Sequence, residues 1–400
     1  MKLKIKKYNL SGQIYLFALL VYAYANILLS TSQFGYVIPT TVLLMFYWFV
    51  DFLLLVKIFL EKNRKQYGKI IIITCLVIIT GMITKDNNYV CMLLLMCSSY
   101  DVDFDDILKT LRFVIISSII VVLGGYFGGI IDETTVRRGG AIRHSLGFKY
   151  VNSIDSLFQH VMVICLYFRW KQKKNNENKT SLMLVLAFAL GAILIYKLSL
   201  SRTTMIISLS FCVLYGLFDI KSRFTSRKRN NKLKKILSLI YFPVCVIMSC
   251  VLPMLLPKSQ FLSYLDILLT GRIGLAYRAL NTYHFRLFGQ SIIWVGSQAV
   301  ATGQFSAAQY NYVDNGYLQI GLQFGVLILI LICVAYSFLF YCMVEENNTF
   351  ICIWVLLVGV ESLINPVLLS VTSNALTIYA VQYFVKKRYS LHYGIKVSKE

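Results

Sequence analysis

Long apolar runs separated by short polar connectors dominate the chain. Many of the runs approach or exceed 18 residues, the length that a helix needs to cross the hydrocarbon core of a membrane. Strands of a membrane β-barrel are shorter and alternate apolar with polar positions, which these runs do not. We therefore expect an all-α polytopic membrane protein of about twelve spans, at residues 10–29, 36–60, 69–84, 88–100, 113–131, 153–170, 181–199, 203–219, 236–256, 317–341, 350–364 and 374–385.

Two longer polar segments interrupt this pattern. The first covers residues 132–152, and the second covers residues 257–318. No internal repeat or low-complexity linker divides the chain, so residues 1–400 are expected to form one integral membrane domain. The segment at 257–318 is the longest one that is neither a span nor a charged tail. We expect it to carry short helices and the chemistry of the protein.

Composition supports the membrane assignment. Apolar residues make up 58% of the chain and charged residues 14%, with a mean hydropathy of +0.67. A soluble core cannot bury so much apolar surface, so part of it is expected to face the lipid bilayer. The net charge of +22 could indicate nucleic-acid binding, but the basic residues are concentrated in the connectors, where they act as topology signals. No nucleic-acid partner is expected.

The basic residues also predict the orientation. An even number of spans places both termini on one side, and that side then holds 29 of the 40 lysines and arginines, including the run at 221–235. The positive-inside rule makes this side cytoplasmic, so residues 132–152 and 257–318 form outer loops. The basic residues at 2–7 precede an apolar run without a small-residue cleavage site, which favours a retained signal anchor.

Metal and nucleotide chemistry find no support in the sequence. The ten cysteines lie in or beside apolar spans, without the spacing of a zinc site or a disulfide framework. Asp101 and Asp103 resemble a metal-binding D-x-D pair, but they fall on the cytoplasmic side, where Asp103 fits the N-cap of an amphipathic helix. The chain has no phosphate-binding G-x-x-x-x-G-K-[S/T] loop. We expect no metal and no other cofactor.

Arginines are unexpectedly frequent on the predicted outer side. Arg202 lies between two apolar runs, and an arginine that points toward the bilayer interior costs about 2.5–3.5 kcal/mol. The planar guanidinium group binds phosphate well. The bland alternative is that each arginine reaches outer headgroups or a loop carboxylate. Together they predict an outward-facing cationic cavity for a phosphorylated or acidic substrate; its members are Arg137, Arg138, Arg143, Arg202, Arg272, Arg278 and Arg286.

Other polar residues could complete such a cavity. His144 and His284 are the histidines of the outer loops, and either one could act as a general base or only hold a loop by hydrogen bonds. Glu361 lies in an apolar span, where a bare carboxylate is costly, so pairing with an outer arginine is expected. Asn315 and Tyr317 could face a sugar, although a tyrosine at a span boundary is often an interface anchor.

Four motifs resemble a known family. Residues 143–148 read R-H-S-L-G-F and are followed by Asn152, residues 199–202 read S-L-S-R, residues 270–272 read T-G-R, and residues 314–318 read D-N-G-Y-L. In order and spacing they resemble the motifs of Wzy-type oligosaccharide repeat-unit polymerases, which are related to O-antigen ligases. The resemblance covers about residues 110–380. Val151 and Gly316 depart from the usual proline and serine, without removing a charged group.

The resemblance implies a GT-C-like, metal-independent glycosyltransferase in the bacterial cytoplasmic membrane. Such an enzyme moves a growing glycan from undecaprenyl pyrophosphate onto the next lipid-linked repeat unit, at the outer face of the membrane. This would build a capsular polysaccharide, an exopolysaccharide or an O-antigen. A flippase and a chain-length regulator are the partners that it implies.

The resemblance also suggests roles for the residues. Arg202 and Arg272 would bind the pyrophosphate, and His284, or alternatively His144 or Asp314, would deprotonate the acceptor hydroxyl. The candidate catalytic residues are thus His284, Arg272 and Arg202. The candidate substrate-binding residues are Arg143, His144, Asn152, Arg278, Asp314, Asn315, Tyr317 and Glu361.

Three other functions compete with this one. An O-antigen-ligase-like transferase would share the motifs and use a different acceptor. A lipid-linked oligosaccharide flippase or another transporter would usually show two related halves and charges deep in several spans, and no repeat is evident here. A membrane scaffold would give no reason for the clustered arginines.

Overall fold

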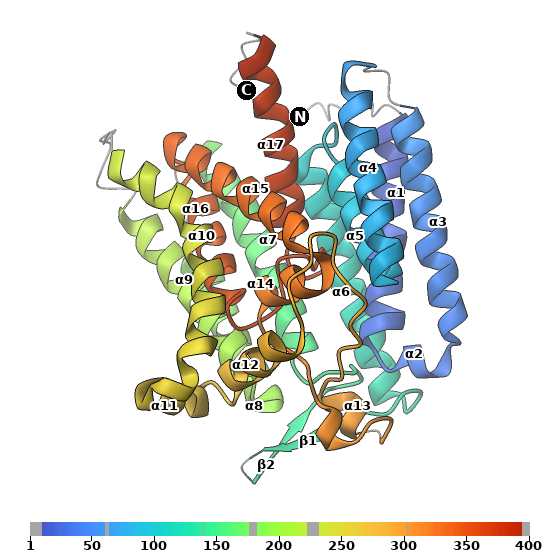
Figure 1. Cartoon of the computed structure of the whole chain (residues 1–400), viewed down its shortest axis with the longest axis vertical. Helices are drawn as coiled ribbons and strands as arrows, with labels where there is room; N and C mark the ends of the chain where they lie inside the picture. Colours follow the sequence, from blue (N-terminus) through green and yellow to red (C-terminus); the bar gives the residue numbers. More distant parts are fainter. Residues whose placement is uncertain are drawn as a thin grey trace.

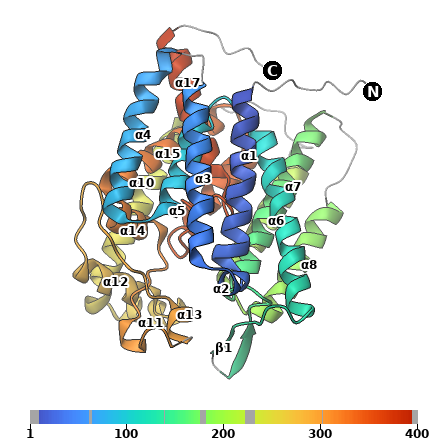
Figure 2. The same ribbon diagram turned by 90° about the vertical axis from the view of Figure 1, so that its right-hand side faces the viewer.

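The computed structural model describes residues 10–60, 64–138, 140–175, 182–221, 232–301 and 303–393. It is a bundle of long helices that run mostly along one axis (Figure 1). The first helix begins and the last helix ends at one end of the bundle, and a β-hairpin with several short helices lies at the opposite end (Figures 1 and 2). The basic residues at 2–7 and most of the run at 221–235 lie outside the described residues.

The first third of the chain forms antiparallel helices. Two aspartates cap helices here: Asp86 accepts a hydrogen bond from the backbone of Tyr89, and Asp103 accepts one from Asp105. The predicted N-cap at Asp103 is confirmed, and Asp101 forms an ion pair with the buried Lys57. The elements are α1 (Leu10–Tyr24), which continues into the π-helical η1 (Ala25–Thr31), α2 (Phe34–Val37), α3 (Thr40–Phe59), α4 (Arg64–Thr84), α5 (Asn87–Ser98) and α6 (Phe104–Phe127).

A β-hairpin occupies the first polar segment. Strands β1 (Thr135–Arg138) and β2 (Ala141–His144) are antiparallel, with Thr135 opposite His144. Four long helices follow: α7 (Ser153–Asn175), α8 (Leu182–Ser199), α9 (Arg202–Lys221) and α10 (Lys232–Leu255). The second polar segment consists of short helices joined by irregular stretches: η2 (Leu256–Lys258), α11 (Gln260–Leu268), α12 (Arg272–Thr282), α13 (Ser297–Ala301), η3 (Ala307–Gln309), α14 (Gly316–Gln319) and η4 (Ile320–Phe324).

The expected span at 317–341 is broken in the structure. Gly325 has a φ of 100°, and it separates η4 from the long helix α15 (Val326–Glu345). A side chain at this position would have its Cβ only 2.5 Å from the carbonyl oxygen of Leu287. The tight packing of a distant segment therefore requires glycine here, and the span begins at residue 326 rather than 317.

A buried irregular connector joins the last two helices, α16 (Thr349–Glu361) and α17 (Leu376–Tyr393). It lies near the middle of the molecule in Figure 1, and Leu368, Val371 and Ala375 are fully buried. Side chains bind its backbone: Asn374 donates to the carbonyl oxygen of Val367, and His160 donates to that of Thr372. Irregular backbone at membrane depth needs such partners, because lipid offers none.

The helices agree with the expected class. A helix coincides with each of the twelve expected spans. Six helical stretches of the described part are long and apolar enough to cross a membrane, and five further apolar helices are shorter. Apart from the β-hairpin, the described chain is helical and has several helices that are able to span a membrane, which agrees with a membrane-embedded protein; the number of twelve crossings stays a prediction.

Aromatic packing fixes α16 against α7 and α9. The ring of Phe350, near the start of α16, stacks on Trp170 of α7 at a centroid distance of 5.6 Å. It also meets Phe211 and Tyr215 of α9 edge-on, each at 5.5 Å. Aromatic pairs at these distances and angles add to the stability gained by burial. The contacts hold the three helices together, and the candidate site lies at their other end.

Candidate functional site

The turn between α8 and α9 is the centre of the candidate site. Ser199 and Ser201 are buried, and the hydroxyl of Ser199 donates to Asp155 Oδ1 at 2.9 Å and accepts from the backbone N–H of Ser201 at 3.2 Å. Leu200 between them has a φ of 51°. A tight turn between two apolar helices leaves backbone groups without helical partners, and these hydroxyls supply them. These hydrogen bonds hold the turn at residues 199–202 in one conformation.

Arg143 reaches this turn from the hairpin. It lies on β2, and its Nε donates to the carbonyl oxygen of Ser199 at 2.6 Å. The hairpin is folded back so that a residue 56 positions earlier in the chain meets the end of α8. This contact joins the first polar segment to the turn between α8 and α9.

Arg272 reaches the same turn from the second polar segment. Thr270 and Gly271 have left-handed φ values of 64° and 81°, and they start α12 with Arg272 as its first residue. Asp266 fixes this start by accepting hydrogen bonds from the backbone N–H groups of residues 273 and 274, at 2.8 and 3.1 Å. The T-G-R motif therefore begins α12 and fixes the direction in which the Arg272 side chain points.

The guanidinium group of Arg272 joins three segments. Its terminal nitrogen donates to Thr203 Oγ1 at 3.3 Å and to the carbonyl oxygen of Ile364 at 2.6 Å. Its Nε lies 3.2 Å from Asp314 Oδ2. Thr203 belongs to α9, Ile364 to the connector after α16, and Asp314 to the D-N-G-Y-L motif. Arg272 is consequently held in one orientation before any substrate binds.

Arg202 lies beside these contacts and is exposed. It is the first residue of α9, next to Thr203. Its side chain forms no ion pair or hydrogen bond with another residue of the described part. The N-terminus of a helix carries a partial positive charge, which repels an arginine and attracts an anion. Arg202 and this helix end together favour an anionic ligand.

Asp314 supplies the carboxylate of the site. Its Oδ2 pairs with Arg272, while Oδ1 has no hydrogen-bond partner among the described residues. Burial raises the pKa of Asp314, and the charge of Arg272 partly offsets this rise. Burial also raises the pKa of the nearby Tyr310, with a further contribution from Asp314. One oxygen of the Asp314 carboxylate therefore remains available to accept a proton.

Several candidate residues lie away from this cluster. His284 is exposed and lies two residues beyond Thr282, the last residue of α12, which is itself about 15 Å along the helix axis from Arg272. His144 pairs with Glu133 at 2.8 Å on the hairpin. The structure thus does not bring either histidine to Arg272. Exposed side chains away from its contacts are those of Arg137, Asn152, Arg278 and Arg286.

Asn315 and Tyr317 are buried rather than exposed to a ligand. The Asn315 amide donates to Ser249 at 3.1 Å, and the Tyr317 hydroxyl donates to the carbonyl oxygen of Gly359 at 3.0 Å. Between them, the N–H of Gly316 donates to the carbonyl oxygen of Ser362 at 2.8 Å. In this conformation Asn315 holds the segment after Asp314 against α10, Tyr317 and the backbone of Gly316 hold it against the end of α16, and the two side chains are turned into the protein.

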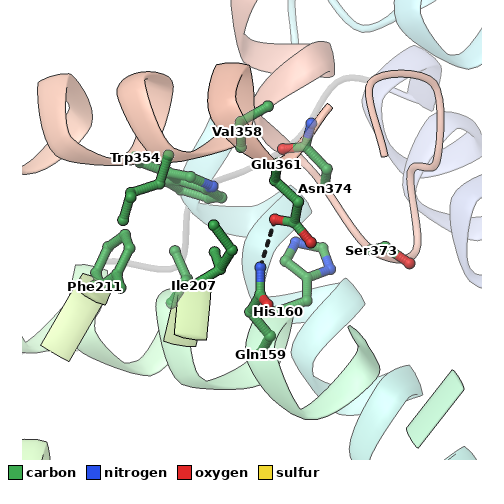
Figure 3. Close-up of a pocket in the computed structure, with 11 residues that line it drawn as sticks. Gln159, His160, Ile207, Phe211, Trp354, Val358, Glu361, Ser373 and Asn374 are labelled. Carbon is green, nitrogen blue, oxygen red and sulfur yellow. Dashed lines mark hydrogen bonds between the residues drawn. The ribbon is translucent and has the colours of Figure 1, made fainter. Parts of the chain in front are cut away.

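Glu361 has an amide as its partner instead of the expected arginine. The side chain of Gln159 on α7 donates to it at 2.7 Å. Both line a small cavity with His160, Ser373, Asn374 and several apolar side chains, and its volume of about 10 Å³ has room for about one water molecule (Figure 3). Glu361 comes from α16, one turn before the carbonyl that Arg272 binds. Its backbone carbonyl oxygen accepts from the N–H of Ile364, so Glu361 lies one turn from the residue that Arg272 contacts.

Sequence reasoning missed three parts of the site. Thr203, the carbonyl of Ile364 and the carboxylate of Asp155 all contact its main residues. Asp155 Oδ2 is buried without a hydrogen-bond partner in the described part. A carboxylate within the apolar run at 153–170 was the available signal for Asp155. Nothing in the local sequence marks the other two, because their role depends on where Arg272 points.

The Glu361–Gln159 contact can be tested by stability. We expect Glu361→Gln to leave the melting temperature of the purified protein nearly unchanged, because an amide oxygen still accepts from Gln159. Glu361→Leu should lower the free energy of unfolding by about 1–3 kcal/mol, because the half-buried amide nitrogen of Gln159 loses its acceptor. Thermal unfolding in detergent measures both. Equal loss in the two variants would show that the charge of Glu361, rather than its hydrogen bond, is what matters.

Comparison of the chain with protein-family models, with curated proteins and with solved structures finds no match.

Proposed function

We propose that this protein polymerises lipid-linked oligosaccharide units at the outer face of the bacterial cytoplasmic membrane. It would transfer the growing glycan from undecaprenyl pyrophosphate to the next lipid-linked unit, without a metal ion. The main support is the convergence of three arginines from separate segments, Arg143, Arg202 and Arg272, around one turn at one end of the bundle. The four sequence motifs, which resemble those of Wzy-type polymerases, also support this proposal.

The arginines fit the leaving group of this reaction. When the bond between the sugar carbon and the pyrophosphate oxygen breaks, negative charge grows on the pyrophosphate. Fixed donors that face this charge stabilise the transition state more than the ground state. Arg272 is fixed by its three contacts, and Arg202 has its charge free at a helix N-terminus. Both would bind the pyrophosphate as it leaves.

Asp314 is the best-placed general base. The acceptor hydroxyl loses its proton as its oxygen bonds to the sugar carbon, and the proton passes to a carboxylate or an imidazole. Asp314 touches Arg272 at 3.2 Å and has a free oxygen, whereas His284 lies beyond the far end of α12. We therefore assign the proton transfer to Asp314 in place of His284.

This assignment predicts a pH dependence. A carboxylate base works only when ionised, so activity should be lost as the pH falls through the pKa of Asp314, which burial raises above its ordinary value of 3.8. Asp314→Asn should slow transfer by about a hundredfold and remove this acidic limb. The rate of glycan transfer measured against pH tests both expectations.

The protonation of Asp314 affects the stability of the fold in the opposite direction to its effect on activity. Because the pKa of Asp314 is raised in the folded state, protonation of this group stabilises the fold as the pH falls toward 3.8. Loss of activity through Asp314 should therefore occur while the protein remains folded, as circular dichroism at the same pH would show. An Asp314→Asn variant with a wild-type rate at every pH would remove Asp314 from the mechanism.

A reconstituted system tests the proposed function. The purified protein is placed in liposomes with labelled lipid-linked units isolated from cells that lack the gene, in the presence of EDTA. We expect a ladder of polymer on gels and release of undecaprenyl pyrophosphate. A ligase would transfer units to a different acceptor without building a ladder. A flippase would move units across the bilayer without forming a glycosidic bond, and either result would overturn the proposal.

A further inference from the structure

Helix α11 follows directly on a helix that can cross the membrane. α10 together with η2 is one of the six stretches with sufficient length and apolar character, and α11 begins two residues after η2 ends. In Figure 1, α10 runs along the bundle axis, whereas α11 lies across it at the end that carries the hairpin. A spanning helix ends where the hydrocarbon core ends. This places α11 at the boundary between the membrane and water.

One face of α11 is apolar and uncovered. Four of its large apolar side chains are exposed, by 71% at Phe261, 63% at Tyr264, 75% at Ile267 and 56% at Leu268. At 100° per residue these positions fall within an arc of about 120°. Leu262, outside this arc, is buried. The helix is thus amphipathic, with its apolar side turned away from the protein.

The other side of α11 is joined to the arginine site. The carboxylate of Asp266 accepts from the backbone at residues 273 and 274, and its carbonyl oxygen accepts from Gly271 at 2.8 Å. Asp266, in the last turn of α11, therefore stabilises the start of α12 through its hydrogen bonds. Since Arg272 is the first residue of α12, the position of α11 sets the position of its guanidinium group.

We propose that α11 is an interfacial anchor whose apolar face enters the lipid bilayer at the boundary of headgroups and acyl chains. Continuity with α10 favours lipid over a protein partner, because the helix is already at the level where lipid begins. Lys258, exposed between the two helices, is suited to a lipid phosphate, and the apolar arc contains no charged residue. Through Asp266 the anchor holds Arg272 at the depth of the phosphate layer; this second part rests on the proposed function.

Photocrosslinking tests the lipid contact without reference to activity. Benzoylphenylalanine replaces Ile267 in one variant and Asn281, an exposed polar residue of α12, in the matched control. Both are reconstituted in liposomes of phosphatidylethanolamine and phosphatidylglycerol with a radiolabelled lipid, and illuminated. We expect lipid adducts at residue 267 at several times the level of the control. Equal labelling, or crosslinking of residue 267 to a second copy of the chain, would overturn the anchor.

A second pair of variants tests the coupling to the site. Ile267→Asp should raise the KM for the lipid-linked unit severalfold with little change in kcat, since the anchor sets where the substrate phosphate is met. Ile267→Leu should restore the wild-type KM. If wild-type protein builds no polymer but residue 267 still labels lipid, the proposed function fails and the anchor stands. A wild-type KM in Ile267→Asp would show that the anchor does not position the site.

Discussion

Replacing Arg202 by alanine is expected to leave no detectable polymer while the protein folds and inserts normally. Arg202 is exposed and has no hydrogen-bond or ion-pair partner in the described part of the chain, so its removal costs the fold at most about 0.5 kcal/mol. Removing the repulsion between Arg202 and the positive end of the helix dipole offsets part of this cost. Removing one donor that faces a developing charge slows a reaction by about 10²–10³-fold. A polymer needs many successive transfers, so such a loss at each step leaves single units.

Lys197→Ala is the matched control for Arg202→Ala. Lys197 is also exposed, lies in the last turn of α8, and loses the same charge when replaced. We expect its polymer ladder to be that of the wild type. Gel analysis of the glycan and thermal unfolding of the purified variants measure the two effects separately. Normal chain lengths in Arg202→Ala, or equal loss in Lys197→Ala, would mean that Arg202 has no specific role at the pyrophosphate.

Replacing Arg272 by alanine is expected to abolish polymer and also to destabilise the protein. Its guanidinium group joins Thr203, Ile364 and Asp314, and hydrogen bonds to charged groups contribute about 1.5–3 kcal/mol each where a partner is left behind. We expect the free energy of unfolding to fall by about 2–3 kcal/mol, with a loss of transfer of about 10³-fold. Arg272→Lys should lose most of the activity as well, because one ammonium group cannot reach three partners.

A double-mutant cycle separates the two roles of Arg272. If Arg272 and Asp314 act as a pair, the stability lost in the double variant Arg272→Ala with Asp314→Asn should be smaller than the sum of the two single losses. Thermal unfolding measures stability, and glycan transfer is measured on the same preparations. Additive stability losses would contradict the pairing, and full-length polymer from Arg272→Lys would contradict the need for a planar guanidinium group.

The contact pattern also favours the proposed enzyme over a transporter. The three arginines gather at one end of the bundle, on segments that the sequence assigns to outer connectors or their edges. In many secondary transporters the binding residues lie near the middle of the membrane, at discontinuous helices. The connector after α16 is such a discontinuity, and Arg272 contacts it at the carbonyl oxygen of Ile364, whereas Glu361 and His160 beside it make hydrogen bonds within the protein. The exposed charge is at the end of the bundle, where a lipid-linked pyrophosphate would arrive.

The sequence by itself determined where most of the helices lie, and that Arg202 and Arg272 are each at the start of a helix. Apolar runs of spanning length predict helices without any tertiary contact, because burial of an apolar segment in lipid depends on its own composition. The starts of two helices also depend on local sequence. The S-L-S-R motif puts Arg202 at the first residue of α9, and the T-G-R motif puts Arg272 at the first residue of α12. Tight turns depend on a few neighbouring residues, so their motifs can be read directly.

The tertiary structure alone decided which of these residues meet. Hydropathy placed a break between the expected spans at 350–364 and 374–385, but it did not show that this connector is buried. Its burial depends on contacts such as the hydrogen bond from His160 to the backbone of Thr372, 212 residues away. The break at Gly325 likewise depends on a contact with Leu287. The selection of Asp314 over His284 as the partner of Arg272 follows from the length and direction of α12. Such contacts join residues far apart in the chain, and local sequence carries no record of them.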